Sequence, residues 1–314
     1  MAISAQDIKR VKSQGFLLNR GTEKFSGRVI TVNGVLTSEQ IAAVSEAAAK
    51  YGDGKVAFTS RLTVEVPGIS FENIELFQEY IGKTGLVTGG TGAKVRPIVA
   101  CKGTTCVFGL HDTQAMAAEI HERFFEGYKN VPLPHKFKIA VGGCPNNCVK
   151  PDLNDLGIVG QLVPNFDEDM CNGCKKCKIE KTCPMKAATV EDGVLEINKD
   201  VCNNCGRCIG QCPFDAIEEG TPGYKIYIGG RWGKKVAQGQ PLSKIFTSEE
   251  EVLDVVEKAI LLFREQGKTG ERFADTIARI GFEEVEKQLL SNEILERKQE
   301  ILDAKLHLAG GASC

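Results

Sequence analysis

Twelve of the thirteen cysteines in this 314-residue chain fall into short-spaced groups. Two pairs occur in CKGTTC, residues 101–106, and in GGCPNNC, residues 142–148, and a separate run of eight cysteines lies between residues 171 and 212. In a reducing compartment, cysteines seldom form disulfides, and short spacing is typical of metal ligands. The sequence therefore predicts that these twelve thiols hold metal.

The eight-cysteine run is one pattern written twice. Residues 171–184 read CNGCKKCKIEKTCP and residues 202–213 read CNNCGRCIGQCP. Three cysteines at C-x2-C-x2-C let a tight loop wrap an iron-sulfur cube, and the proline after the fourth cysteine ends the loop. Zinc is the alternative, because C-x2-C pairs also build zinc ribbons, but a zinc site needs neither the third cysteine nor the C-P. The pattern favours iron-sulfur clusters.

Over about fifty residues this run resembles a bacterial two-cluster ferredoxin. The resemblance implies that each cluster takes three cysteines from one copy and the fourth from the other. The two implied ligand sets are Cys171, Cys174, Cys177 with Cys212, and Cys202, Cys205, Cys208 with Cys183. Because ferredoxin modules move single electrons, another part of the chain should consume them.

The other four cysteines are spaced C-x4-C and then C-x3-C, which does not fit the ferredoxin pattern. Here the chain resembles the siroheme-dependent nitrite and sulfite reductases, whose signature is a spaced cysteine pair followed by C-x3-C. The first pair is one residue shorter than the C-x5-C usual in that family. The resemblance implies a [4Fe-4S] cluster on Cys101, Cys106, Cys144 and Cys148, with Cys148 also binding the siroheme iron.

The same resemblance implies four cations beside the substrate. FTSRLTVEVPGI resembles the family's first arginine strand and holds Arg61, KVRPIVAC holds Arg96, and LPHKFKIAVGGC holds Lys136 and Lys138. Since alternate residues of a strand share a face, the two lysines should point together. Each charge alone is more often a solvated surface residue. The four charges occur in the same order along the chain as in the family, and the last two lead into the cysteine loop. This order favours a site that binds an oxyanion, stabilises its departing oxygens and relays protons.

Siroheme is a polycarboxylate, so the resemblance implies further cations around it. The candidates are Lys94, Lys102, Arg231, Lys234 and Lys235. The thirteenth cysteine, Cys314, ends a Gly-Gly-Ala-Ser-Cys tail and is expected to be a free thiol.

Hydrophobic periodicity predicts a mixed α+β and α/β chain. RVITVNG, TSEQIAAVSEAAAKYG, KVAFTSRLTVEVPG and FENIELFQEYIGKTG predict strand, helix, strands and helix, with a capping box from Thr37 to Gln40. RPIVACKG, a helix over 112–125 and FKIAVGG predict an α/β unit. YKIYIGGRW then resumes a strand. TSEEEVLDVVEKAILLFREQG predicts an amphipathic helix on the sheet, and residues 271–306 are expected to be helical and to serve association.

Four segments follow from these elements and from the resemblance. We expect a ferredoxin-like half-domain at 1–90, the first part of a siroheme-binding catalytic α/β domain at 91–165, an inserted bacterial dicluster ferredoxin module at 166–220, and the rest of the catalytic domain with C-terminal helices at 221–314.

The composition of the chain argues against some classes of binding partner. The formal net charge is −2, with 42% hydrophobic and 25% charged residues, so neither nucleic acid nor a membrane surface is expected as a partner. The stretch MAISAQDIKRVKSQ lacks the apolar core of a signal peptide, and no apolar run approaches the length of a spanning helix. We expect a cytoplasmic protein.

The chain is similar to the anaerobic, single-repeat sulfite reductases with an inserted ferredoxin domain. That resemblance implies a small siroheme enzyme for the six-electron reduction of sulfite to sulfide or of nitrite to ammonia. The expected cofactors are siroheme and three [4Fe-4S] clusters. No flavin or nicotinamide fingerprint is present, so the electron donor should be a ferredoxin or a flavoprotein subunit. Larger family members contain the unit twice, one copy lending cations and the other the cluster; this chain has one copy, which predicts a homodimer. The alternative is an electron-transfer subunit without siroheme, and the pocket residues do not decide between sulfite and nitrite.

Overall fold

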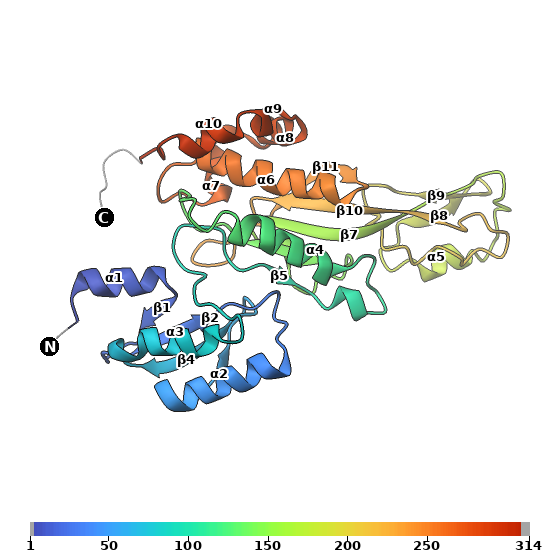
Figure 1. The fold of residues 1–314 in the computed structure, drawn as a ribbon. Helices are drawn as coiled ribbons and strands as arrows, with labels where there is room; N and C mark the ends of the chain where they lie inside the picture. The colour runs from blue at the N-terminus through green and yellow to red at the C-terminus, as the bar shows by residue number, and fades with distance from the viewer. Residues whose placement is uncertain (1–2, 309–314) are drawn as a thin grey trace.

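The computed structural model describes residues 3–308 of the chain. Figure 1 shows an N-terminal lobe, a central sheet with helices packed on it, and a narrow extension that carries β8, β9 and α5. Cys314 lies outside the described residues.

The N-terminal lobe is an antiparallel sheet of order β1-β2-β4-β3 covered by helices. Its core includes Phe16, Phe25 and Phe77, all fully buried. The predicted capping box is confirmed, because the Thr37 backbone N–H donates to the Gln40 side chain and the Gln40 N–H donates to the Thr37 hydroxyl. The elements are α1 (Ala5–Ser13), β1 (Phe16–Leu18), β2 (Phe25–Val29), α2 (Ser38–Tyr51), β3 (Ala57–Phe58), β4 (Val64–Ile69), η1 (Phe71–Asn73) and α3 (Ile74–Gly82).

The central sheet has the order β11-β10-β7-β6-β5. Strands β5, β6 and β7 are parallel, whereas β10 and β11 are antiparallel to their neighbours. The helix predicted over 112–125 begins after the N-cap Asp112 as α4 and ends in a π-helical turn, η3. The elements are β5 (Val99–Ala100), α4 (Thr113–Ile120), η3 (His121–Glu126), β6 (Ile139–Gly142), β7 (Leu156–Pro164), β10 (Gly220–Ile228) and β11 (Gln240–Phe246).

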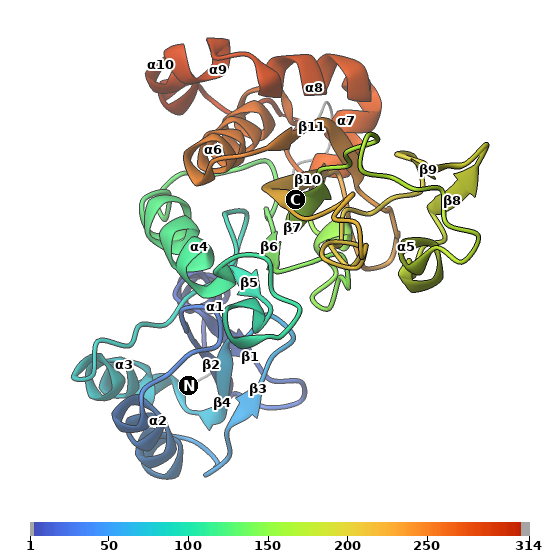
Figure 2. The ribbon, with the colours of Figure 1, turned by 90° about the vertical axis from the view of Figure 1, so that its right-hand side faces the viewer.

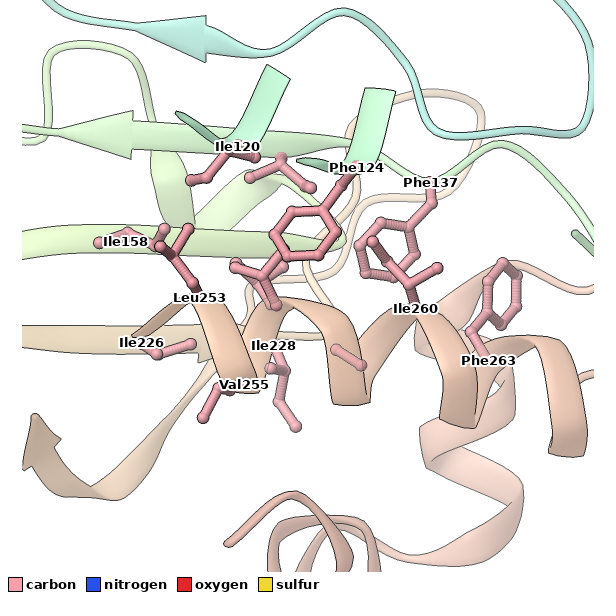
Figure 3. Close-up of a cluster of buried hydrophobic side chains, with 14 of the residues drawn as sticks. Ile120, Phe124, Phe137, Ile158, Ile226, Ile228, Leu253, Val255, Ile260 and Phe263 are labelled. Atoms are coloured by element: carbon pink, nitrogen blue, oxygen red, sulfur yellow. The ribbon is translucent and has the colours of Figure 1, made fainter. Parts of the chain in front are cut away.

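Helix α6 (Glu249–Gln266) packs on the central sheet, where Leu253 and Ile260 meet apolar side chains of the strands and of α4 (Figure 3). The capped helix predicted here is confirmed and packs on the sheet as expected, but the polar side of its second half is not exposed to solvent. Residues 258–264 are all buried, including Lys258 and Arg264. The reason is that the C-terminal helices cover the face of α6 that periodicity assigned to solvent.

The C-terminal segment is helical, as predicted, and packs on α6. It comprises α7 (Phe273–Ile280), α8 (Phe282–Leu290), α9 (Glu293–Glu296) and α10 (Lys298–Asp303). Its buried Phe273 packs against Phe137 and Phe263, with ring centroids 5.3 and 5.5 Å away. The segment therefore completes the core of the central domain, and its expected part in association stays a prediction.

Residues 165–219 form an insert at the end of a long hairpin. Strands β7 and β10 pair without interruption from Leu156 with Ile228 to Pro164 with Gly220. The insert holds α5 (Lys178–Thr182), β8 (Ala188–Glu191) and β9 (Val194–Ile197). It has a small core of its own around Ile179, Leu195 and Ile217. Because its two ends are neighbours in one ladder, the insert leaves the sheet register intact.

No helix within residues 3–308 is both long and apolar enough to span a bilayer.

Arg264 joins the C-terminal helices to the segment that leads into β6. Its buried guanidinium donates to the carbonyls of Pro132 (2.6 Å), Ile301 (3.0 Å), Leu302 (2.8 Å) and Ala304 (2.8 Å). We predict that Arg264→Met lowers the free energy of unfolding by about 3 kcal/mol, because buried carbonyls lose their donors. Urea denaturation measures the change. Arg297→Met is the matched control, since its pair with Glu265 is exposed on the arginine side and should contribute less than about 1 kcal/mol. Equal losses in the two variants would contradict this prediction.

Candidate functional site

Four cysteines gather where β5 and β6 end. Cys101 follows the last residue of β5, and Cys144 and Cys148 follow β6. Cys106 comes directly after the 3-10 turn η2 (Gly103–Thr105). Burial raises the pKa of the Cys144 thiol, and the nearby thiols of Cys101, Cys148 and Cys106 raise it further. The predicted group of four therefore does come together.

Two glycines allow the cysteine loops to approach each other. A Cβ on Gly143 would lie 3.0 Å from the Cα of Gly103, so a larger residue would push the loops apart. The Gly143 N–H donates to the Cys101 sulfur at 3.2 Å. Thr113 at the start of α4 donates to the Cys101 carbonyl at 2.8 Å. The loop that carries Cys101 is thus fixed from both sides.

The donor set suits an iron-sulfur cluster better than a single hard cation. Cys148 is exposed, whereas Cys101, Cys106 and Cys144 are half-buried. Within residues 3–308, no group of three or more His, Cys, Asp or Glu side chains is arranged to hold a metal ion. The fit therefore depends on the chemistry of the four thiols, because soft thiolates are ligands of iron-sulfur clusters and of zinc.

In the insert, Cys183 from the first motif lies with three cysteines of the second. Burial raises the pKa of Cys208 to about 11, and Cys202, Cys205 and Cys183 add to the shift. The same four side chains line one small cavity. This is the combination that the ferredoxin resemblance implied. In the other implied set, Cys171, Cys177 and Cys212 pack against the small core of the insert.

A group of cations lies at the opposite ends of the same strands. Arg96 precedes β5, and Lys136 and Lys138 precede β6. Burial lowers the pKa of Lys138 to about 8, and the charges of Arg61, Arg272 and Lys136 lower it further. The pKa of Lys136 is lowered by burial, Arg272 and Arg96. The four predicted substrate-side cations are thus neighbours.

Arg61 lies in the turn between β3 and β4, not on a strand as predicted. Its guanidinium donates to the carbonyls of Pro97 (3.1 and 2.6 Å) and Ile139 (3.0 Å) and to the Asn154 side chain (3.0 Å). Burial lowers its pKa to about 10. Because most of its donors already have partners, Arg61 fastens the N-terminal lobe to the first residues of the central strands.

Arg96 keeps more of its donor capacity. One terminal nitrogen donates to the Gly90 carbonyl, while the buried Nε has no hydrogen-bond partner among the described residues. Burial lowers the pKa of Arg96 to about 10, and Arg28 and Arg272 lower it further. Arg96 therefore uses fewer of its donors on protein carbonyls than Arg61 does.

Sequence reasoning missed three charged residues of this group. Asp155 is fully buried and accepts two hydrogen bonds from Arg272 Nη2, at 2.9 and 2.8 Å, and one from the Lys138 backbone N–H at 2.9 Å. Burial raises the pKa of Asp155, and Arg272 opposes that rise. Arg28 pairs with Glu65 and donates to Gly90 at 3.3 Å. Only the fold brings these residues together, so no local pattern indicates them.

The five candidate siroheme cations lie in separate parts of the chain, and their contacts with siroheme stay a prediction. Lys94 precedes β5 and lines a cavity beside η3, whereas Lys102 follows β5 and is exposed. Arg231 pairs with Asp275 at 2.8 Å. Lys234 and Lys235 lie in an exposed loop. Strand β5 separates Lys94, which precedes it, from Lys102, which follows it.

Cations and thiols are likewise separated by the strands that carry them. Lys138 and Gly143 flank β6, and five residues of extended chain span roughly 16 Å. One small anion therefore cannot contact both groups of the same chain.

Two family models match the chain. Residues 91–298 match the nitrite and sulphite reductase 4Fe-4S domain. Residues 19–83 match the nitrite/sulfite reductase ferredoxin-like half domain. The half-domain predicted at the front of the chain is thereby supported.

Curated relatives and a solved structure agree with these matches. The coenzyme F420-dependent sulfite reductase of Methanocaldococcus jannaschii is 35% identical over 82% of this chain, which spans 41% of that protein. An uncharacterized protein of the same organism is 31% identical over 83% of this chain and 90% of that protein. The crystal structure of dissimilatory sulfite reductase I has the same fold, with a TM-score of 0.68, 23% identity, and coverage of 85% of this chain and 69% of that one. The chain belongs to the nitrite and sulfite reductase family with a 4Fe-4S domain.

Proposed function

We propose that the chain is a siroheme-dependent reductase of sulfite, with electrons supplied through its cysteine-rich insert. The observation that carries the proposal is the grouping of four cysteines at one end of β5 and β6 and of buried cations at the other. Sulfite is preferred because a relative that covers most of the chain is named a sulfite reductase. Nitrite is the alternative substrate, and an electron carrier without siroheme is the alternative function.

The cysteines would hold the cofactors. Cys101, Cys106, Cys144 and Cys148 would hold one [4Fe-4S] cluster, with Cys148, the exposed member, turned toward the siroheme. The eight cysteines of the insert would hold two more clusters. When bound, siroheme and its coupled cluster supply the electrons that reduce the anion.

The cations would bind and protonate the substrate. The guanidinium of Arg96, which makes one hydrogen bond among the described residues, would donate to an oxyanion, and Lys136 and Lys138 would add positive charge. A lysine whose pKa is about 8 stays mostly protonated at neutral pH and still releases its proton readily. Arg61, whose donors are largely engaged, would keep this group in position.

A homodimer would complete the site. In one chain, the cations and the thiols lie at opposite ends of β6, too far apart for a small anion to contact both. A two-fold pair of chains can bring the cations of one subunit over the cysteines of its partner, because in such an interface any contact between residue i and residue j of the two chains occurs twice, once in each direction.

Cofactor content tests the proposal directly. We expect protein purified without oxygen to contain about thirteen irons per chain, from three four-iron clusters and one tetrapyrrole. Cys148→Ser should lose the siroheme absorption bands while the insert clusters remain. Steady-state rates with sulfite and with nitrite, under a chemical reductant, would rank the substrates. About eight irons and no extractable tetrapyrrole would support the electron-carrier alternative instead.

The lowered pKa of Lys138 predicts how stability and activity depend on pH. Because its pKa is lowered to about 8, the charged form is disfavoured in the native state, so its cost to stability is complete below pH 8 and vanishes as pH rises toward the ordinary lysine value. Lys138→Met should therefore be more stable than the parent at pH 7 and equal to it at high pH. The same variant should reduce sulfite ~100-fold more slowly, and parent activity should fall above pH 8. Lys287→Met, an exposed lysine on α8, is the control; a variant less stable at pH 7 would contradict the assignment.

Complementation tests the shared site. Alone, Lys138→Met should keep only about 1% of the parent activity, and Cys148→Ser should be inactive. When they are co-expressed with different tags, half of the dimers are mixed, and each has one intact site made by the unaltered cations of one chain and the unaltered cysteines of the other. Activity should return to about a quarter of the parent value. Fully active monomers in sedimentation, or mixed dimers without activity, would rule out this arrangement.

A further inference from the structure

The second motif of the insert is attached to the central domain. The Leu162 N–H on β7 donates to the Asn204 carbonyl at 2.8 Å, and Leu162 forms a bridge with Cys205. The Arg207 guanidinium lies over the Phe108 ring, 5.3 Å from its centroid. Phe108 is two residues beyond Cys106, so this cation-π contact joins the second motif to the loop of the four-cysteine group.

A polar cavity makes the same connection on another side. It is lined by Pro145 and Asn147 of the GGCPNNC loop together with Cys202 and Asn203 of the second motif. The second motif therefore borders both loops of the four-cysteine group. We name Cys183, Cys202, Cys205 and Cys208 the inner set.

The first motif contacts the insert's own hairpin instead. The Leu195 N–H on β9 donates to the Cys171 sulfur at 3.4 Å. A Cβ on Gly173 would overlap the Gly193 carbonyl oxygen, 1.9 Å away, so these two turns are in close contact. In Figures 1 and 2, α5 and the β8–β9 hairpin lie in the extension, away from the N-terminal lobe and the C-terminal helices. We name Cys171, Cys174, Cys177 and Cys212 the outer set.

The first motif, residues 171–184, has a net charge of opposite sign to that of the rest of the insert. Residues 165–219 contain seven Lys and Arg residues and eleven Asp and Glu residues. Four of the lysines fall within seven positions of the first motif. This lysine segment is Lys175, Lys176, Lys178 and Lys181, all exposed. No salt bridge involves them among residues 3–308.

We propose that an acidic one-electron carrier protein docks on the lysine segment and reduces the chain through its outer cysteine set. This inference rests on the proposed function, because the cysteines must hold clusters. In each encounter the carrier loses one electron and the outer cluster gains it, with no bond made and no proton moved. Electrons then pass from the outer set to the inner set and on to the four-cysteine group. Such encounters need only a small interface, and unpaired exposed charges raise their association rate.

Rapid mixing with a reduced plant-type [2Fe-2S] ferredoxin tests the docking site on the complete holoenzyme. The triple variant Lys175→Gln, Lys176→Gln and Lys181→Gln should be reduced ~10-fold more slowly at low ionic strength, and its rate should depend less on salt. The control removes three exposed lysines elsewhere, through Lys9→Gln, Lys55→Gln and Lys287→Gln, and should match the parent. Reduction by methyl viologen, a small cation, should be equal in all three proteins.

The readouts separate two kinds of failure. If both triple variants accept electrons from ferredoxin at the parent rate, while viologen reduces their clusters normally, the docking site is wrong and the proposed function stands. If the reduced parent protein gives no electron paramagnetic resonance signal from the insert clusters, both proposals fail.

Discussion

The buried carboxylate of Asp155 is the interaction on which the cation group depends. Arg272, Lys138 and Arg61 would repel one another at these positions. The pKa values of Arg61, Lys136 and Lys138 are lowered by burial and by neighbouring positive charges. Asp155 accepts hydrogen bonds from Arg272 and from the Lys138 backbone, so it compensates part of that repulsion and fixes the amino end of β7. The compensation is incomplete, and an oxyanion would supply the missing negative charge. Cations that are held in place before an anion arrives need no rearrangement to bind it.

Parallel strands impose the second constraint. In β5 and β6, backbone pairing places all preceding residues at one edge and all following residues at the other, so Arg96 and Lys138 cannot share a surface with Cys101 and Cys144. Under the proposed function, a chain with one such unit would present one half-site at each edge of the sheet, and a two-fold dimer would join them. The insert does not disturb this arrangement. It connects β7 to β10 beyond the edge of the sheet where the cysteine loops lie.

Sequence reasoning succeeded where a pattern is local. The cysteine spacings, the capping box at Thr37 and the alternation around Phe137 depend on neighbours in the chain, and all could be read from it. It failed where the partner is distant. Arg272 meets Asp155 across 117 positions, and Arg61 meets the carbonyl of Ile139 across 78. The burial of α6 on both sides also depends on helices that follow it, because periodicity describes one face of a helix and not what later covers the other.

Although the net charge of the chain is small, positive side chains cluster in two places, near Lys138 and in the lysine segment, and the two clusters differ in burial. The cations near Lys138 are half-buried, and the arginines among them donate to backbone carbonyls. The lysine segment is exposed on a narrow extension, where flexible ammonium groups can meet the surface of another protein without ordering a deep pocket. The degree of burial of the cations, more than their charge, thus distinguishes a small anion from a protein as the partner. Desolvated cations select by size and hydrogen bonding, whereas exposed lysines act through a field that salt screens over about 10 Å. The same sign of charge can therefore attract an oxyanion at one end of the molecule and an electron-carrying protein at the other.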